Sequence, residues 1–130
     1  MVRSGEKSLD LARKRILIVD DEQDLRETLA DFLQMSGAYA VCASDGNEAF
    51  NIINKGGIDL VVCDIKMPEC SGIELLHKVR ASNEKTPPII MMSGFTDFSE
   101  KDVLDLGAKA MFMKPQTLTK LKELILEVLS

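Results

Sequence analysis

Five short apolar segments, separated by helix-like stretches, constrain the fold of this sequence more than any other feature. The segments are Arg15–Val19, Ala38–Ala43, Leu60–Cys63, Ile89–Met92 and Ala110–Met113. Several are apolar at nearly every position instead of alternating with polar residues, which is typical of strands buried on both faces. The segments therefore predict a central parallel sheet.

The stretches between these segments repeat apolar residues at the period of an α-helix. The apolar stripes are Leu25, Leu29, Phe32 and Leu33; Ala49, Ile52 and Ile53; Ile73, Leu76 and Val79; and Leu118, Leu121, Ile125 and Val128. The helix expected between Phe98 and Leu106 has the weakest pattern. Strands that alternate with helices predict a single doubly wound α/β domain over residues 15–130, preceded by a basic leader, flexible or helical, at 1–14.

Composition and charge narrow the class of protein further. Hydrophobic residues make up 45% and charged residues 28% of the chain, as in ordinary globular proteins. No apolar run approaches the roughly 20 residues that span a bilayer, and the N-terminus lacks the apolar segment of a signal peptide. We therefore expect a cytoplasmic protein with no membrane insertion. Cys42, Cys63 and Cys70 with the single His77 give no zinc-site spacing, and we expect Cys42 and Cys63 to be buried.

The charges are unevenly distributed along the chain. Residues 1–15 carry five basic and two acidic side chains, whereas the other 115 residues carry eleven basic and nineteen acidic ones. An acidic body disfavours direct binding of nucleic acid, because phosphate backbones attract Lys and Arg.

Polar side chains follow four of the five predicted strands. Asp20 and Asp21 follow the first, Asp64 the third, Ser93 the fourth and Lys114 the fifth. The carboxyl ends of parallel strands meet at one edge of a sheet, where doubly wound domains bind their ligands. We therefore expect these side chains to lie close together.

This set of residue types suits a cation and a phosphoryl group. Two carboxylates 4 Å apart repel each other by about 4 kcal/mol at an effective dielectric constant of 20, so a cluster needs a cation or a proton. Oxygen ligands beside a phosphate suit Mg²⁺. An aspartate can act as a nucleophile toward phosphorus, with Lys114 and Ser93 as partners of the transferred group.

Each residue also has a local explanation. Asp20 or Asp21 could cap the next helix, Asp64 and Ser93 could be turn residues, and Lys114 could be a solvated loop lysine. Independent caps and turns have no reason to occur at the ends of neighbouring strands with complementary chemistry, which favours a joint site.

Four segments of the chain together resemble the receiver domains of response regulators in two-component signalling. They are ILIVDDEQDLRE with its acidic pair, VVCDIKMPECSG with the spacing D-x-x-M-P-x-x-x-G, IIMMSG with its serine, and FMKP with its Lys-Pro pair. The resemblance extends from about Arg15 to Leu129. It implies a flavodoxin-like sheet of strand order 2-1-3-4-5 flanked by five helices.

The resemblance also implies a role for each residue of the set. Asp64 is the expected phosphoacceptor. Asp21, Asp64 and the backbone carbonyl of Lys66 are the expected ligands of Mg²⁺, or of Mn²⁺ in its place, and Asp20 would act largely through water. Ser93 and Lys114 would contact the phosphoryl group.

Further residues of the chain are implicated in switching and in the lifetime of the phosphorylated state. The Lys114–Pro115 bond corresponds to one that is usually cis in the family. Met111 stands where the family usually has an aromatic switch residue, and Phe112, one residue later, is expected on the opposite face. Gln116 replaces a residue that is often apolar. The resemblance also implies that Lys66 and Phe95 occupy positions that tune hydrolysis of the acyl phosphate in related domains.

The expected function is a phosphoacceptor switch and not an enzyme with an external substrate. A sensor histidine kinase or a phosphotransfer protein would donate the phosphoryl group, and a surface around the fourth helix, fifth strand and fifth helix would then bind a downstream effector. An aspartate-based phosphohydrolase would need a second aspartate where Lys66 stands. A flavin carrier is disfavoured by the acidic first loop. A receiver-like module that is never phosphorylated remains the other alternative.

Overall fold

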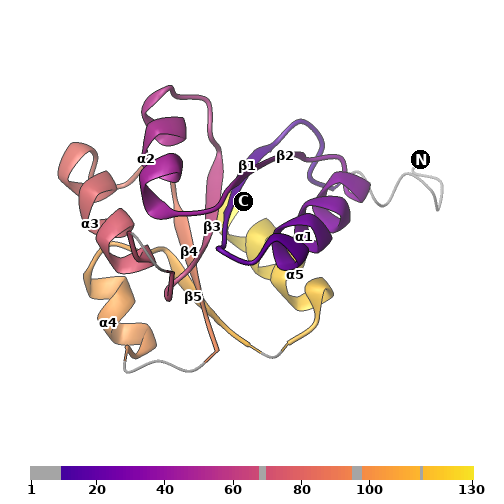
Figure 1. Ribbon diagram of the computed structural model, residues 1–130. Helices are drawn as coiled ribbons and strands as arrows, with labels where there is room; N and C mark the ends of the chain where they lie inside the picture. The colour runs from indigo at the N-terminus through magenta and orange to yellow at the C-terminus, as the bar shows by residue number, and fades with distance from the viewer. Residues whose placement is uncertain (1–9, 68–69, 95–97, 115) are drawn as a thin grey trace.

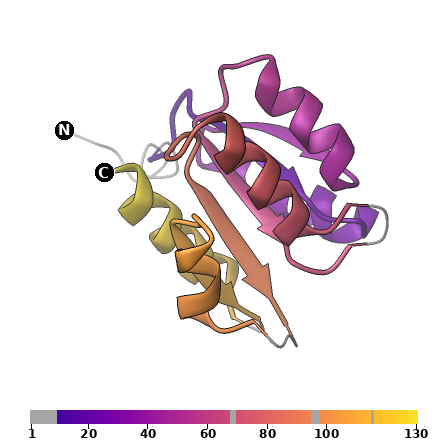
Figure 2. The same cartoon turned by 90° about the vertical axis from the view of Figure 1, so that its left-hand side faces the viewer.

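A five-stranded sheet forms the centre of the domain in the structure, a computed structural model that describes residues 10–67, 70–94, 98–114 and 116–130. The strands are β1 (Arg15–Val19), β2 (Tyr39–Ala43), β3 (Leu60–Asp64), β4 (Ile89–Ser93) and β5 (Ala110–Met113). They pair in parallel in the order β2-β1-β3-β4-β5, which confirms the predicted topology. All carboxyl ends therefore meet at one edge, to which the arrowheads point in Figure 2.

The helices cover both faces of this sheet (Figure 1). Helices α1 (Gln23–Met35) and α5 (Leu118–Leu129) pack on one face. Helices α2 (Gly46–Asn54), α3 (Gly72–Ser82) and α4 (Glu100–Asp105) pack on the other. None of the helices in the described part of the chain has the length and apolar character that a bilayer crossing requires.

The sheet divides the apolar core into two layers. In β1, Ile16 and Ile18 pack toward α1 and α5, whereas Leu17 and Val19 pack toward α2 and α3. Both sets are fully buried, and β3 shows the same alternation. Covering on both faces explains why these strands are apolar at consecutive positions.

Side-chain caps fix the start of several helices. Asp45, Ser71, Ser99 and Thr117 each accept a hydrogen bond from the backbone of the first turn that follows. These bonds satisfy N–H groups that have no partner within the helix. The shortest helix, α4, has six residues, of which only Val103 is buried. Its single buried anchor explains the weak apolar pattern in the sequence.

The exposure of Cys42 and the packing of residues 10–14 differ from what the sequence predicted. Cys42 is exposed, contrary to expectation, because β2 is an edge strand. Residues 10–14, within the expected leader, pack against the domain: the Leu11 side chain is 1% exposed, and its N–H donates to the Ser36 carbonyl oxygen at 2.8 Å. Asp10 also lies 3.3 Å from the Lys122 ammonium of α5.

Candidate functional site

Three carboxylates meet at the carboxyl edge of the sheet. Asp20 and Asp21 follow β1, and Asp64 is the last residue of the neighbouring strand β3. One oxygen of each lies within 4.8 Å of the others. Asp20 and Asp64 are 2% and 9% exposed, whereas Asp21 is open to solvent. A compact set of oxygen donors that faces solvent on one side fits Mg²⁺, which keeps water ligands.

Burial changes the protonation of the two inner carboxyls. It raises the pKa of Asp64; the Lys114 ammonium lowers that pKa, and the Asp20 carboxylate raises it further. Burial likewise raises the pKa of Asp20, against a hydrogen bond from the Glu22 backbone that lowers it. Both carboxyls are therefore less readily ionised than exposed aspartates, and a bound cation would oppose this effect.

Lys114 comes from the loop after β5 and crosses to β3. Its Nζ lies 3.6 Å from Oδ2 of Asp64. Its backbone N–H donates to the carbonyl oxygen of Ser93 at 2.7 Å, which extends the pairing of β5 with β4 by one step. The ammonium group is thereby held beside the carboxylate that the sequence predicts to be the nucleophile.

Ser93 is the last residue of β4 and is 2% exposed. Among the described residues, its buried hydroxyl has no hydrogen-bond partner. A buried hydroxyl without a hydrogen-bond partner costs free energy. A phosphoryl oxygen is a suitable acceptor for this hydroxyl.

Hydrogen bonds hold both the carboxylate and the backbone carbonyl of Asp20. Oδ1 accepts from the Glu22 N–H at 2.9 Å, and the backbone carbonyl accepts from Nη1 of Arg26 at 2.7 Å. No motif of the sequence pointed to Arg26. The only available signal was its position six residues after Asp20, on the predicted first helix.

Gly72 allows α3 to approach the end of β3. A Cβ atom there would lie 2.7 Å from Cε of Met91 and closer still to the carbonyl oxygen of Asp64. The glycine that closes the D-x-x-M-P-x-x-x-G motif is therefore required by close packing under the site.

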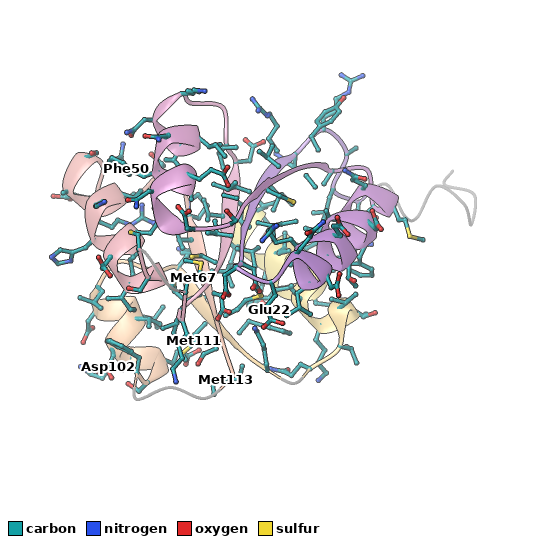
Figure 3. The ribbon with its side chains drawn as sticks, viewed as in Figure 1. Glu22, Phe50, Met67, Asp102, Met111 and Met113 are labelled. Carbon is teal, nitrogen blue, oxygen red and sulfur yellow. The ribbon has the colours of Figure 1, made fainter. Side chains whose placement is uncertain are left out.

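Met111 and Phe112 lie on opposite faces of β5, as their alternation implies. Met111 packs with Met67 and Val103 in the layer under α3 and α4, whereas Phe112 packs toward α1 and α5. Figure 3 shows Met111 and Met67 on the side of the sheet that carries α3 and α4. Met111 is 7% exposed and so occupies an inward position near the site.

The remaining predicted residues are less defined. Lys66 is exposed, and its backbone hydrogen bond lowers the pKa of Asp64. Phe95, Pro115 and the expected cis bond before Pro115 lie outside the described residues.

Strand order and site together define a class: a flavodoxin-like α/β domain with a cluster of three carboxylates at the carboxyl edge of its sheet. The model of the response regulator receiver domain family matches residues 16–126. The chain therefore belongs to the receiver domain family of response regulators.

Sequence relatives agree with this assignment. The chain is similar to the probable transcriptional regulator ycf27 of Guillardia theta, with 35% identity over 99% of this chain and 51% of the relative. It is also similar to the Regulator of RpoS of Escherichia coli K12, with 34% identity over 88% of this chain and 34% of the relative. The chain thus spans about half, or less, of the length of these relatives.

Solved structures share the fold over nearly the whole chain. Chemotaxis protein CheY4 of Vibrio cholerae has a TM-score of 0.81 and 30% identity, covering 90% of this chain and 99% of that one. CheY of Borrelia burgdorferi, in a complex with CheX, BeF₃ and Mg²⁺, has a TM-score of 0.86 and 27% identity, covering 98% and 99%. Response regulator TrrA of Thermotoga maritima, in complex with Mg²⁺ and beryllium fluoride, has a TM-score of 0.80 and 33% identity, covering 88% and 98%.

Proposed function

We propose that this receiver domain is a phosphoacceptor switch in a two-component phosphorelay and that Asp64 takes the phosphoryl group. The observation that carries the proposal is the placement of the buried Asp64 carboxylate 3.6 Å from the Lys114 ammonium. One oxygen of each of two further carboxylates, Asp20 and Asp21, lies within 4.8 Å of an Asp64 oxygen. At the end of the neighbouring strand β4, the buried Ser93 hydroxyl has no hydrogen-bond partner among the described residues. A carboxylate in this setting can attack phosphorus, and the neighbouring groups suit the charge and oxygens of the product.

Asp21, Asp64 and the backbone carbonyl of Lys66 would hold Mg²⁺ directly, with Asp20 acting largely through water. Mg²⁺ would neutralise negative charge between the carboxylates and an incoming phosphoryl group. The Mg²⁺–beryllium fluoride complexes of the Borrelia and Thermotoga relatives support this proposal. Mn²⁺ has similar coordination chemistry and is expected to substitute.

The chemical step is a single displacement at phosphorus. An Asp64 carboxylate oxygen forms a bond to phosphorus while the bond from phosphorus to the donor breaks, and the donor leaves with that electron pair. Lys114 pairs with the transferred group, and Ser93 donates its hydroxyl hydrogen to a phosphoryl oxygen. No other covalent bond of the chain changes, so the domain acts as a signalling module and not as an enzyme with an external substrate.

Movement of Ser93 and Lys114 toward the phosphoryl group would bias the surface formed by α4, β5 and α5. Met111 lies in the same core layer as Val103 of α4, where its flexible side chain can repack as α4 shifts. Pro115 would assist the rearrangement of the loop after β5. A downstream effector would recognise the altered surface.

The donor would be a sensor histidine kinase or a phosphotransfer protein, and the pathway would operate in the cytoplasm. The acidic body of the chain argues against direct contact with nucleic acid.

The test is incubation with Mg²⁺ and acetyl phosphate, followed by intact-mass measurement of the wild type and of Asp64→Asn. We expect the mass of one phosphoryl group on the wild type alone, and none when EDTA replaces Mg²⁺. Absence of an Asp64-dependent adduct would overturn the proposal and leave a binding module that is never phosphorylated.

Lys66 and Phe95 are proposed to slow hydrolysis of the acyl phosphate by restricting the approach of water. The double variant Lys66→Ala/Phe95→Ala should lose its phosphoryl mass faster than the wild type in a time course after removal of the donor. Equal decay rates would contradict this role.

A further inference from the structure

Arg26 projects from the first turns of α1 to the chain segment that carries the acidic cluster. Its Nη1 donates to the carbonyl oxygen of Asp20 at 2.7 Å, in a partly buried position. Its own N–H donates to the carbonyl oxygen of Glu22 at 3.0 Å, as expected at the start of a helix. Arg26 thus connects α1 to the residue that immediately follows β1.

The Asp20 carbonyl needs a partner that the sheet does not supply. The ladder between β1 and β3 ends at Val19, paired with Cys63, and the Asp20 N–H makes a last bond to Ala43 at 3.2 Å. Asp20 is 2% exposed, so a carbonyl without a partner there would be costly. The Arg26 guanidinium fills this role with a charge-assisted hydrogen bond.

Three contacts together fix the orientation of Asp20. Its N–H is held by β2, its carbonyl by Arg26, and Oδ1 by the Glu22 N–H at 2.9 Å. Glu22 itself makes no side-chain cap to α1, so the bend between β1 and α1 depends on these contacts. Figure 3 labels Glu22 in the segment that joins β1 to α1. Because these contacts already order the Asp20 carboxylate, binding of a cation would cost it little further conformational entropy.

Two effects of Arg26 on a cation have opposite signs. Its positive charge repels Mg²⁺, so loss of the charge alone would strengthen binding. Its hydrogen bond orders a carboxylate of the site, so loss of the bond would weaken binding. Among the ion pairs of the described residues, none joins Arg26 to Asp20, Asp21 or Asp64. Arg26 therefore acts on the site through the Asp20 backbone.

We propose that Arg26 is a positioning residue for Mg²⁺: through the Asp20 carbonyl it holds the acidic cluster in its cation-binding arrangement. This role for Arg26 rests on the proposed function, because it requires that Asp20, Asp21 and Asp64 form a Mg²⁺ site. Loss of a hydrogen-bond partner of a direct metal ligand typically changes metal affinity by about 10- to 100-fold. Arg26 lies one step further from the metal than such a partner, so we expect a change at the lower end of this range.

The experiment is a Mg²⁺ titration of the full chain, followed by amide chemical shifts. It compares the wild type, Arg26→Met, Arg26→Lys and the control Lys109→Met, which removes an exposed charge at the other end of the sheet. We expect a dissociation constant about tenfold higher for Arg26→Met, a smaller rise for Arg26→Lys, and no loss of affinity for the control. Urea unfolding of each variant reports any change in stability separately.

The outcomes separate the two proposals. Tighter binding by Arg26→Met would show that the effect of its charge outweighs the effect of its hydrogen bond, and unchanged binding would show no net effect of Arg26. Either result would overturn the positioning role, while leaving the Mg²⁺ site intact. If Arg26→Met does not fold, Arg26→Lys carries the same test, because it keeps the charge but changes the hydrogen-bond geometry. Failure of the wild type to bind Mg²⁺ would overturn both the positioning role and the cation site.

Discussion

At the scale of single residues, the site combines groups that are unfavourable in the resting fold. Ser93 is buried with a hydroxyl that has no partner among the described residues, and Asp20 and Asp64 are carboxylates with little access to water. Each of these features lowers the stability of the domain in the absence of a ligand.

Replacing Ser93 by alanine should stabilise the domain in the absence of a phosphoryl group. The substitution removes a buried hydroxyl that has no partner in the described part of the chain, and the free energy of unfolding should rise by about 1 kcal/mol. Urea denaturation in buffer without Mg²⁺ measures the change. A less stable variant would show that the hydroxyl already has a partner in the resting protein.

The raised pKa values of Asp20 and Asp64 predict a specific dependence of stability on pH. Because both carboxyls bind protons more tightly in the folded state, their contribution to stability is largest at low pH. It is lost as pH rises from the ordinary value of 3.8 through the raised folded values.

Urea unfolding between acidic and neutral pH, with EDTA present, measures this effect. The wild type should lose stability with rising pH relative to the double variant Asp20→Asn/Asp64→Asn, which lacks both titrations. Parallel curves for the two proteins would contradict the raised pKa values.

At the scale of elements, the junction of β3 with α3 depends on Gly72. Gly72→Ala should lower the free energy of unfolding by about 2–3 kcal/mol, because the added Cβ would collide with the Asp64 backbone and with Met91. Gly94→Ala is the matched control, since a Cβ there meets none of the described residues within 4 Å. Thermal or urea unfolding compares them, and equal effects would refute the steric explanation.

The strands and most helices were predictable because their apolar periods are local properties of the sequence. The ends of the elements were less predictable. Asp64 and Ser93 were expected to follow the third and fourth strands, but they are the last residues of β3 and β4. Leu25 and Leu118, assigned to apolar stripes, are 44% and 37% exposed. They border a hollow of about 230 Å³ between α1 and α5, which also includes Asp20 and Lys114. An apolar stripe in the sequence predicts which face of a helix a side chain lies on, but it does not predict whether a neighbouring helix covers that side chain.

At the scale of the whole molecule, the domain extends before β1. Leu11 joins the core layer under α1 and α5, so Leu11→Ala should lower the free energy of unfolding by about 2–4 kcal/mol. The exposed Leu104→Ala should cost far less. Urea denaturation distinguishes them, and equal small effects would mean that residues 10–14 contribute little to the fold.

The sequence by itself determined the alternation of strands and helices, the parallel sheet and the polar residue types at its carboxyl edge. These follow from periodicity and from the order of elements along the chain, which do not depend on distant contacts. The four motifs by themselves also indicate the family.

Only the tertiary structure decided which polar groups have partners. The bond from Arg26 to Asp20, the buried hydroxyl of Ser93 and the docking of Leu11 depend on how loops approach from different parts of the chain. Asp64 was recognisable as a candidate nucleophile from its motif. Its pKa direction and its 3.6 Å separation from Lys114 are set by burial and by strand pairing, which no local pattern encodes.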